Sequence, residues 1–145
     1  EIYTLSLHDA LPILVPMKSE DSKIFYPVDS DKVVMRSVVT KDQAKDLVSE
    51  IKDIEPMRIE NDRQREAKYK EALVSCDCKQ LICIIKTMYA RNKERIAKGK
   101  RITYVDDRYL KEAKQNLNDE FSIALGIEPR EVEKYIKAQF VEQEA

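Results

Sequence analysis

The chain has 145 residues, of which 43% are hydrophobic and 37% are charged, and its formal net charge is −1. This length holds one modest domain, or a small domain with part of another. A net charge near zero excludes a global basic bias as the basis of nucleic-acid binding. No apolar run approaches the length that crosses a membrane, so the sequence predicts a soluble protein without a membrane partner.

Charge is distributed unevenly along the chain. Between Lys86 and Arg101 there are seven basic residues and one acid, Glu94, which gives a local balance of +6. From Ile102 to the end, ten acids face six bases, which gives −4. A cationic element on a neutral to acidic body indicates a surface that faces an anion. A solvated helix end is the alternative, because cations are favourable near a helix C-terminus.

The first thirteen residues, EIYTLSLHDALPI, differ from the rest of the chain. They begin without a methionine and lack both the cationic start and the small-residue cleavage site of a signal peptide. The string resembles translated sequencing-adapter DNA, and we interpret residues 1–13 as a leader that is not native to the fold. An amphipathic segment that packs through Leu5, Leu7, Leu11 and Ile13 is the alternative. The only histidine, His8, lies in this leader.

Two short β-prone runs follow, at residues 14–17 and 23–28, and the polar turn between them predicts a hairpin. Pro16 and Pro27 indicate edge strands or strand ends. Because two strands alone are marginally stable, we interpret residues 14–39 as the remnant of a truncated β domain with an extended connector.

Residues 40–145 predict five helices with short loops, so the expected fold class is mainly α, with a compact five-helix domain. Each helix has a start signal. These signals are Thr40 with Gln43, Asn61 or Asp62, Asp77 with Gln80, Thr103, and Pro129 at the first helical position. Gly99 and Gly126 are expected to end the third and fourth helices.

Apolar residues recur at helical spacing and predict the buried faces. The predicted core residues are Ala44, Leu47, Val48, Ile51, Leu81, Ile84, Ile85, Met88, Leu110, Ala113, Leu117, Phe121, Ala124, Val132, Tyr135, Ile136 and Phe140. Five aromatic side chains either pack in or beside this core, which their spacing favours, or form a stacking surface for bases. They are Tyr89, Tyr104, Tyr109, Phe121 and Tyr135.

No catalytic motif can be written from these residues. Gly99 and Gly126 are the only glycines, so neither a P-loop nor a dinucleotide fingerprint fits. With one histidine, in the leader, the chain lacks a Ser/His/Asp or Cys/His set. The carboxylates alternate with Lys and Arg on helix faces, where i,i+4 pairing explains them. We therefore expect a protein that is not an enzyme and has no cofactor.

Three cysteines, Cys76, Cys78 and Cys83, lie within eight positions. Their odd number and close spacing argue against disulfides, and reduced thiols suit a cytoplasmic protein. A metal site with Asp77 as the fourth ligand would not have the wider spacing of structural zinc sites. We expect no metal, with Cys83 facing the core and the other two thiols at a helix start.

Five segments stand out by their order and spacing. They are PVDSDKV with the arginine after it (27–33 and Arg36), REAKYKEAL (65–73), the CD before the third helix, IIKTMYARNKERIAKGK (84–100), and the closing LGI with its EPREVEKYI tail (128–136). Together they resemble the CarD-like bacterial transcription regulators, over about residues 14 to 140. None of the five is a catalytic motif.

This resemblance implies a regulator in two parts. A Tudor-like β domain would dock on the β subunit of bacterial RNA polymerase, and residues 14–39 would be its remnant. The helical domain, residues 40–145, would lie against promoter DNA beside the −10 element and stabilise the open complex through backbone contacts and a minor-groove wedge. The family often has a tryptophan wedge near the start of the second helix. This chain has no tryptophan, and Met57 and Arg58 lie in that neighbourhood.

We therefore predict a cytoplasmic, monomeric transcription regulator that binds RNA polymerase and promoter DNA. The predicted DNA contacts lie near the start of the second helix and in a basic hinge after the third. They are Arg58, Arg63, Arg65 and Lys68, and Arg91, Arg95, Lys100, Arg101 and Arg108. The alternative is a helical protein–protein adaptor whose basic hinge binds an acidic partner.

Overall fold

The computed structural model describes residues 13–14, 21, 24–25 and 36–144, without the side chains of residues 13, 14, 24 and 140–144. The chain divides into two compact units, Glu1–Met35 and Arg36–Ala145. In the first unit, β1 (Ile13–Leu14) pairs antiparallel with β2 (Ile24–Phe25), in agreement with the predicted hairpin. The pairing begins at Ile13, the last residue of the predicted leader. His8 and the rest of the leader lie outside the described residues.

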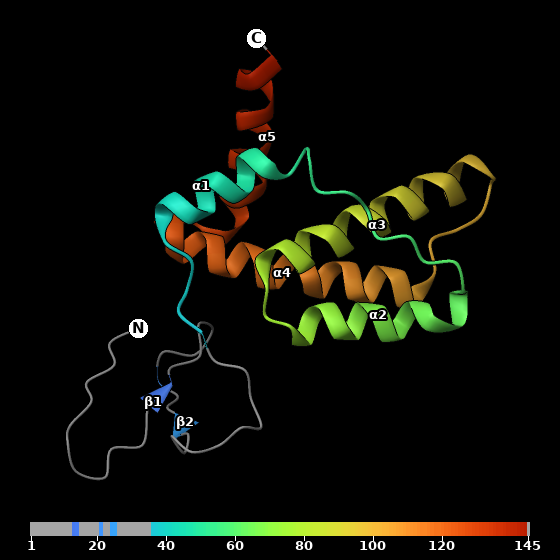
Figure 1. The fold of residues 1–145 in the computed structure, drawn as a ribbon, viewed down its shortest axis with the longest axis horizontal. Helices are drawn as coiled ribbons and strands as arrows, with labels where there is room; N and C mark the ends of the chain where they lie inside the picture. The colour runs from blue at the N-terminus through green and yellow to red at the C-terminus, as the bar shows by residue number, and fades with distance from the viewer. Residues whose placement is uncertain (1–12, 15–20, 22–23, 26–35, 145) are drawn as a thin grey trace. The chain divides into compact units, whose positions relative to one another are not determined.

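The second unit has five helices in its described part, so the mainly α prediction is confirmed (Figure 1). They are α1 (Lys41–Glu50), α2 (Asp62–Val74), α3 (Cys78–Ala97), α4 (Tyr104–Leu125) and α5 (Pro129–Glu144). The long helix α4 packs against each of the other four. It is therefore the element around which the unit is built.

The helix starts follow the predicted signals. Thr40 and Gln43 form a complete capping box, and the Thr103 hydroxyl accepts a hydrogen bond from the Asp106 backbone N–H. Asn61, not Asp62, caps α2. Asp77 caps α3 through the Lys79 N–H. Each cap satisfies a backbone donor that the first turn of a helix leaves unpaired.

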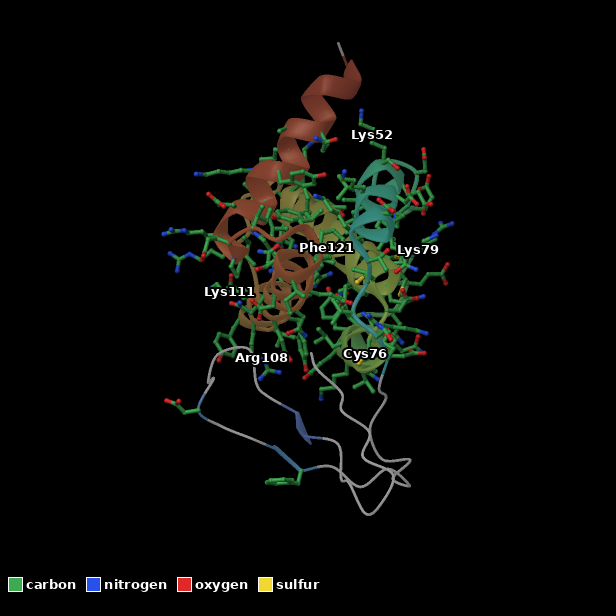
Figure 2. The ribbon with its side chains drawn as sticks, turned by 90° about the vertical axis from the view of Figure 1, so that its left-hand side faces the viewer. Lys52, Cys76, Lys79, Arg108, Lys111 and Phe121 are labelled. Carbon is green, nitrogen blue, oxygen red and sulfur yellow. The ribbon has the colours of Figure 1, made fainter. Side chains whose placement is uncertain are left out.

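The core lies where α1, α2, α3 and α5 meet α4, and it contains most of the predicted stripe. Its most buried large side chains include Phe121, Ile84, Met88 and Val132. Figure 2 shows Phe121 among the helices, whereas Arg108 and Lys111 lie at the surface. Burial of each large apolar side chain contributes roughly 1.5–3 kcal/mol to folding.

The aromatic residues divide between core and surface, so packing explains only some of them. Tyr109 and Phe121 are buried, and Tyr135 is partly buried against the core. Tyr89 and Tyr104 are exposed. The core prediction is therefore wrong for these two. The side chain of Phe140 lies outside the described residues.

The predicted placement of the cysteines is also wrong. Cys78 is the buried one, with 3% of its surface exposed, because it begins α3 in register with Leu81 and Ile82. Cys83 is partly exposed, and its Sγ donates a hydrogen bond to the Glu55 carbonyl oxygen at 3.3 Å. The thiol of the helix start, not the one inside the helix, thus faces the core.

Arg36 attaches the connector before α1 to the helices. Its guanidinium forms a two-pronged ion pair with Glu120 of α4, in which Nη2 lies 2.7 Å from Oε2, and it also donates to the Cys76 carbonyl oxygen. The same carboxylate accepts hydrogen bonds from the Val39 N–H at 3.1 Å and the Cys78 thiol at 3.1 Å. One carboxylate therefore joins the connector, α3 and α4.

Candidate nucleic-acid interface

Near the end of the helical unit that carries the predicted site, α3 contacts the starts of α2 and α4. Arg91, on α3, donates from Nε to Asp106 of α4 at 2.9 Å and from Nη1 to Asp62 of α2 at 3.0 Å. Figure 1 shows the starts of α2 and α4 on the right-hand side of this unit, with the end of α3 on the same side above them. Arg91 therefore fixes the position of the basic residues on these three ends.

The carboxylate of Asp106 is the buried centre of this junction, with 1% of the residue exposed. It accepts a hydrogen bond from the Tyr69 hydroxyl at 2.9 Å, in addition to the one from Arg91. Burial alone would raise the pKa of Asp106, but hydrogen bonding with Thr103, Arg91 and Tyr69 outweighs it, so the pKa is lowered. Asp106 is therefore a structural anion and leaves the surface cations uncompensated.

A second set of contacts joins α2 to α4 beside this junction. The Tyr109 hydroxyl donates to Glu66 Oε1 at 2.9 Å, and the rings of Tyr69 and Tyr109 pack with centroids 5.6 Å apart. The Arg108 guanidinium lies 4.7 Å above the centre of the Tyr109 ring, a cation–π geometry. These contacts fix the position of α2 relative to α4.

Three of the nine predicted DNA contacts are engaged inside the protein. Arg65 donates from Nε to Asp62 at 3.0 Å, and only 13% of its side chain is exposed. Arg91 holds the junction just described. Arg95 donates from Nε to the Arg101 carbonyl oxygen at 3.0 Å. The hydrogen bond from Arg65 and the charge of Arg91 lower the pKa of Asp62. These guanidinium groups stabilise the structure beneath the surface. Because their charges are already paired or hydrogen-bonded, they are poorly available to a ligand.

Three others are exposed and have loose partners. Arg58 lies in the segment between α1 and α2, with 92% of its side chain exposed and Glu60 at 4.0 Å. Lys68 lies 3.6 Å from Glu71, and Arg108 lies 3.7 Å from Glu66. Exposed pairs at such distances contribute little. A shallow hollow of about 210 Å³ separates Arg58 from Lys68. Met57, the other residue near the expected wedge, packs against the core.

The remaining three, Arg63, Lys100 and Arg101, are exposed and make no side-chain ion pair within the described part of the chain. Arg63 is the second residue of α2, beside Asp62. Arg101 lies beside Arg95, which is one helical turn beyond Arg91 on α3. The structure thus brings these three cations to the same end of the helical unit.

The turn between α3 and α4, residues 98–103, is fixed by its backbone. Gly99 has φ of 70°, the left-handed conformation that glycine adopts without strain. The Lys100 N–H donates to the Arg95 carbonyl oxygen at 2.8 Å, and the Gly99 N–H donates to that of Ile96 at 2.9 Å. These two bonds form a Schellman motif, which closes the end of α3. Lys100 and Arg101 are therefore held on an ordered turn.

Sequence reasoning missed three features of this surface. Lys86 belongs to the basic run but turns inward, where its ammonium caps the carbonyl end of α1. Lys93 is exposed and has no ion pair among the described residues. Tyr104, the first residue of α4, is 77% exposed. Its place in the helix gave no signal for this exposure, because Asp106, in the same first turn, is buried.

The described residues contain no group of three or more His, Cys, Asp or Glu side chains placed to hold a metal ion. Within the same part of the chain, every helix is too short or too polar to cross a membrane.

A protein-family model described as the C-terminal domain of CarD matches residues 46–137. The chain belongs to the CarD family. The match includes α2, α3, α4 and the turn that presents Lys100 and Arg101, so it covers the whole candidate interface of this CarD-family domain. Searches of curated proteins and of solved structures gave no match.

Proposed function

We propose that this protein is a cytoplasmic, non-catalytic transcription regulator whose helical unit binds promoter DNA near the −10 element and stabilises the open complex. Membership of the CarD family supports a role in transcription. The observation that carries the DNA contact is the set of three exposed cations without ion-pair partners in the described chain, Arg63, Lys100 and Arg101, at one end of the unit. Phosphates are the ligand that such cations neutralise, with release of counterions.

The rigid support of these cations favours this function. Arg91 and Arg95 hold the helix ends and the turn in place through internal hydrogen bonds. The backbone of Lys100 and Arg101 therefore needs little ordering when a phosphate backbone approaches, which lowers the entropic cost of binding. Arg58 lies beside this surface, where we propose that it contacts a groove and favours opened over closed duplex.

The experiment is a salt titration of binding to a forked promoter duplex. Wild-type affinity should fall steeply with salt. Reversal of both turn cations, Lys100→Glu with Arg101→Glu, should lower affinity for all sequences and reduce the slope of log K against log salt by about two. The matched control is Lys41→Glu with Lys45→Glu, since these exposed α1 residues change the net charge equally without touching the interface.

Two results would contradict the proposed DNA contact. If the Lys100/Arg101 reversal leaves DNA binding and its salt slope intact but abolishes capture of a protein partner after nuclease treatment, the protein is an adaptor. An equal loss in the Lys41/Lys45 control would also contradict the proposed surface, because net charge alone would then explain the effect.

We also propose that residues 14–39, and not the leader before them, carry the family's contact with the RNA polymerase β subunit. The paired strands β1 and β2 support a β-domain origin for this segment. Binding of the whole chain, but not of residues 36–145, to the isolated β subunit is the expected result. Equal binding by both would place the contact in the helical unit instead.

A further inference from the structure

The turn between α3 and α4 presents apolar side chains as well as cations. Four large hydrophobic residues within ten positions are exposed: Ile96 at 60%, Ile102 at 41%, Tyr104 at 77% and Val105 at 37%. Elsewhere in the described helical unit, exposed large hydrophobic residues are scattered singly, as on most proteins. Ile102 lies in the turn, Ile96 lies at the end of α3, and Tyr104 and Val105 begin α4. Exposed apolar side chains gathered around one turn are typical of a contact surface.

The charges around this cluster are cationic and uncompensated. Among nearby acids, Glu94 is paired with Lys98, Asp107 is paired with Lys111 at 2.7 Å, and Asp106 is buried. Lys100 and Arg101, between Ile96 and Ile102 in sequence, form no ion pair in the described chain. Lys98 has the larger effect in lowering the pKa of Glu94, and the charge of Lys100 helps to lower it further. The surface therefore matches a ligand that has both anionic groups and apolar faces.

The cluster is held in place before any ligand binds. The Schellman motif at Gly99 closes α3, Arg95 binds the Arg101 carbonyl oxygen, and the Thr103 cap starts α4 directly before Tyr104. The exposed side chains therefore project from an ordered backbone. This preorganisation lowers the entropic cost of contact with a partner.

We propose that this apolar tip, made of Ile96, Ile102, Tyr104 and Val105, contacts unstacked bases of the nucleic acid whose phosphates Lys100 and Arg101 hold. A base offers an apolar face to aliphatic side chains and a π-face for stacking on the Tyr104 ring, independent of sequence. The inference rests on the proposed function and deepens it. The tip is distinct from the segment around Met57 and Arg58, and it places base contact on the α3–α4 turn.

Nucleic acid fits this surface better than an anionic membrane does. Helices that lie in a membrane interface present an apolar face along their length. Here α3 and α4 bury their apolar stripes in the core, through residues such as Ile84, Met88 and Leu117. Outside the tip, Tyr89 of α3 and Ile123 of α4 are exposed singly and form no continuous apolar face. A surface of one turn suits one or two bases, whereas it is small for a bilayer.

The test uses the whole chain and forked DNA that carries 2-aminopurine, a fluorescent base analogue, in its unpaired arm. The tip variant is Tyr104→Ser with Ile102→Ser. The matched control is Tyr89→Ser with Ile123→Ser, which removes the same two side-chain types from exposed sites outside the tip. Tyr104→Phe keeps the ring and should bind as wild type. Circular dichroism should show that all variants are folded.

We expect the tip variant to bind the fork about tenfold more weakly and to lose the 2-aminopurine signal. Its affinity for fully paired duplex should stay within about twofold, and its salt slope should not change, because its cations are intact. The control pair should match wild type in both assays.

Three results would overturn the inference. Wild-type fork binding by the tip variant, with a normal salt slope, would refute the tip and leave the proposed function standing. A comparable loss in the control pair would show a nonspecific effect. Tip-dependent binding to phosphatidylserine vesicles, without DNA binding by the wild type, would make the tip a membrane contact and refute the proposed function as well.

Discussion

The Asp106 side chain holds α2, α3 and α4 together. Its carboxylate accepts hydrogen bonds from Tyr69 of α2 and Arg91 of α3, while its own N–H is bound by the α4 cap. Such a buried anion is favourable only when its partners are in place. Loss of its charge should therefore loosen the junction that positions the candidate interface.

Asp106→Asn should destabilise the protein by about 2–3 kcal/mol, because hydrogen bonds to a buried charge are lost. The folded-state pKa of Asp106 is lowered. Its contribution is therefore fully present above the ordinary aspartate value of about 4 and is lost as pH falls through the lower folded pKa. Urea unfolding should show the difference between wild type and variant at pH 7, and this difference should shrink as pH falls below about 4.

Asp107→Asn is the matched control, because Asp107 is the next residue of α4 and pairs with Lys111 at the surface. It should change stability by about 0.5 kcal/mol or less. A variant at position 106 that is as stable as this control at pH 7 would contradict the role given to the junction.

The thiol of Cys78 is the second residue-scale feature. Burial and then the hydrogen bond and charge of Glu120 raise its pKa to about 12. Because the thiolate is the reactive form, Cys78 should resist iodoacetamide at pH 8 in the folded protein. The partly exposed Cys76 and Cys83 should be alkylated, as mass spectrometry of the labelled peptides would show. In urea all three thiols should react. Folded protein that is labelled at Cys78 as fast as at Cys76 would refute the buried placement.

At the scale of single elements, the C-terminal end of α1 is capped by a lysine side chain from α3. The Lys86 ammonium, on α3, lies 2.6 Å from the Ile51 carbonyl oxygen and 2.5 Å from that of Ile54. These carbonyls have no partner within the helix, and a cation at a helix C-terminus is also favoured by the helix dipole. Lys86 thus joins α1 to α3.

Lys86→Met should lower the free energy of unfolding by about 1–2 kcal/mol, since charged hydrogen bonds to partly buried carbonyls are lost. The salt slope of DNA binding should remain that of wild type, because this cation faces inward. Chemical denaturation and the salt titration measure the two effects on one preparation. A smaller salt slope with unchanged stability would mean that Lys86 faces the DNA after all.

The elements themselves were predictable because their signals are local. The Thr40 and Thr103 caps, Gly99 in the left-handed region, and Pro129 at a helix start each act within one turn of chain. The inward roles of Lys86 and Arg91 were not predictable, because their partners lie 15 to 35 positions away. The basic run of residues 86–101 correctly predicted which end of the helical unit carries exposed cations. It did not distinguish the cations that support the turn from those that face solvent.

At the scale of the whole molecule, the helical unit contains its own core. Every core residue described lies between Val39 and Ile136. A fragment of residues 36–145 should therefore fold by itself with the stability of its full-length counterpart, and deletion of residues 1–13 should change stability by no more than about 0.5 kcal/mol. Loss of folding in either deletion would show that the N-terminal unit contributes to this core, for example through Leu5, Leu7 and Leu11.

The contribution of the connector residues 36–39 to the helical unit can be tested by moving the start of the fragment. A fragment of residues 40–145 keeps all five helices but loses the ion pair of Arg36 with Glu120 and the hydrogen bond from Val39 to the same carboxylate. Glu120, a mostly buried carboxylate, is then left without its cation. This shorter fragment should be less stable than residues 36–145 by about 1–2 kcal/mol, a modest value because a third of the Arg36 side chain is exposed. Arg36→Met in the longer fragment should reproduce most of the loss, and Arg36→Lys should restore part of it. Equal unfolding midpoints for both fragments would show that the connector does not stabilise the helical unit.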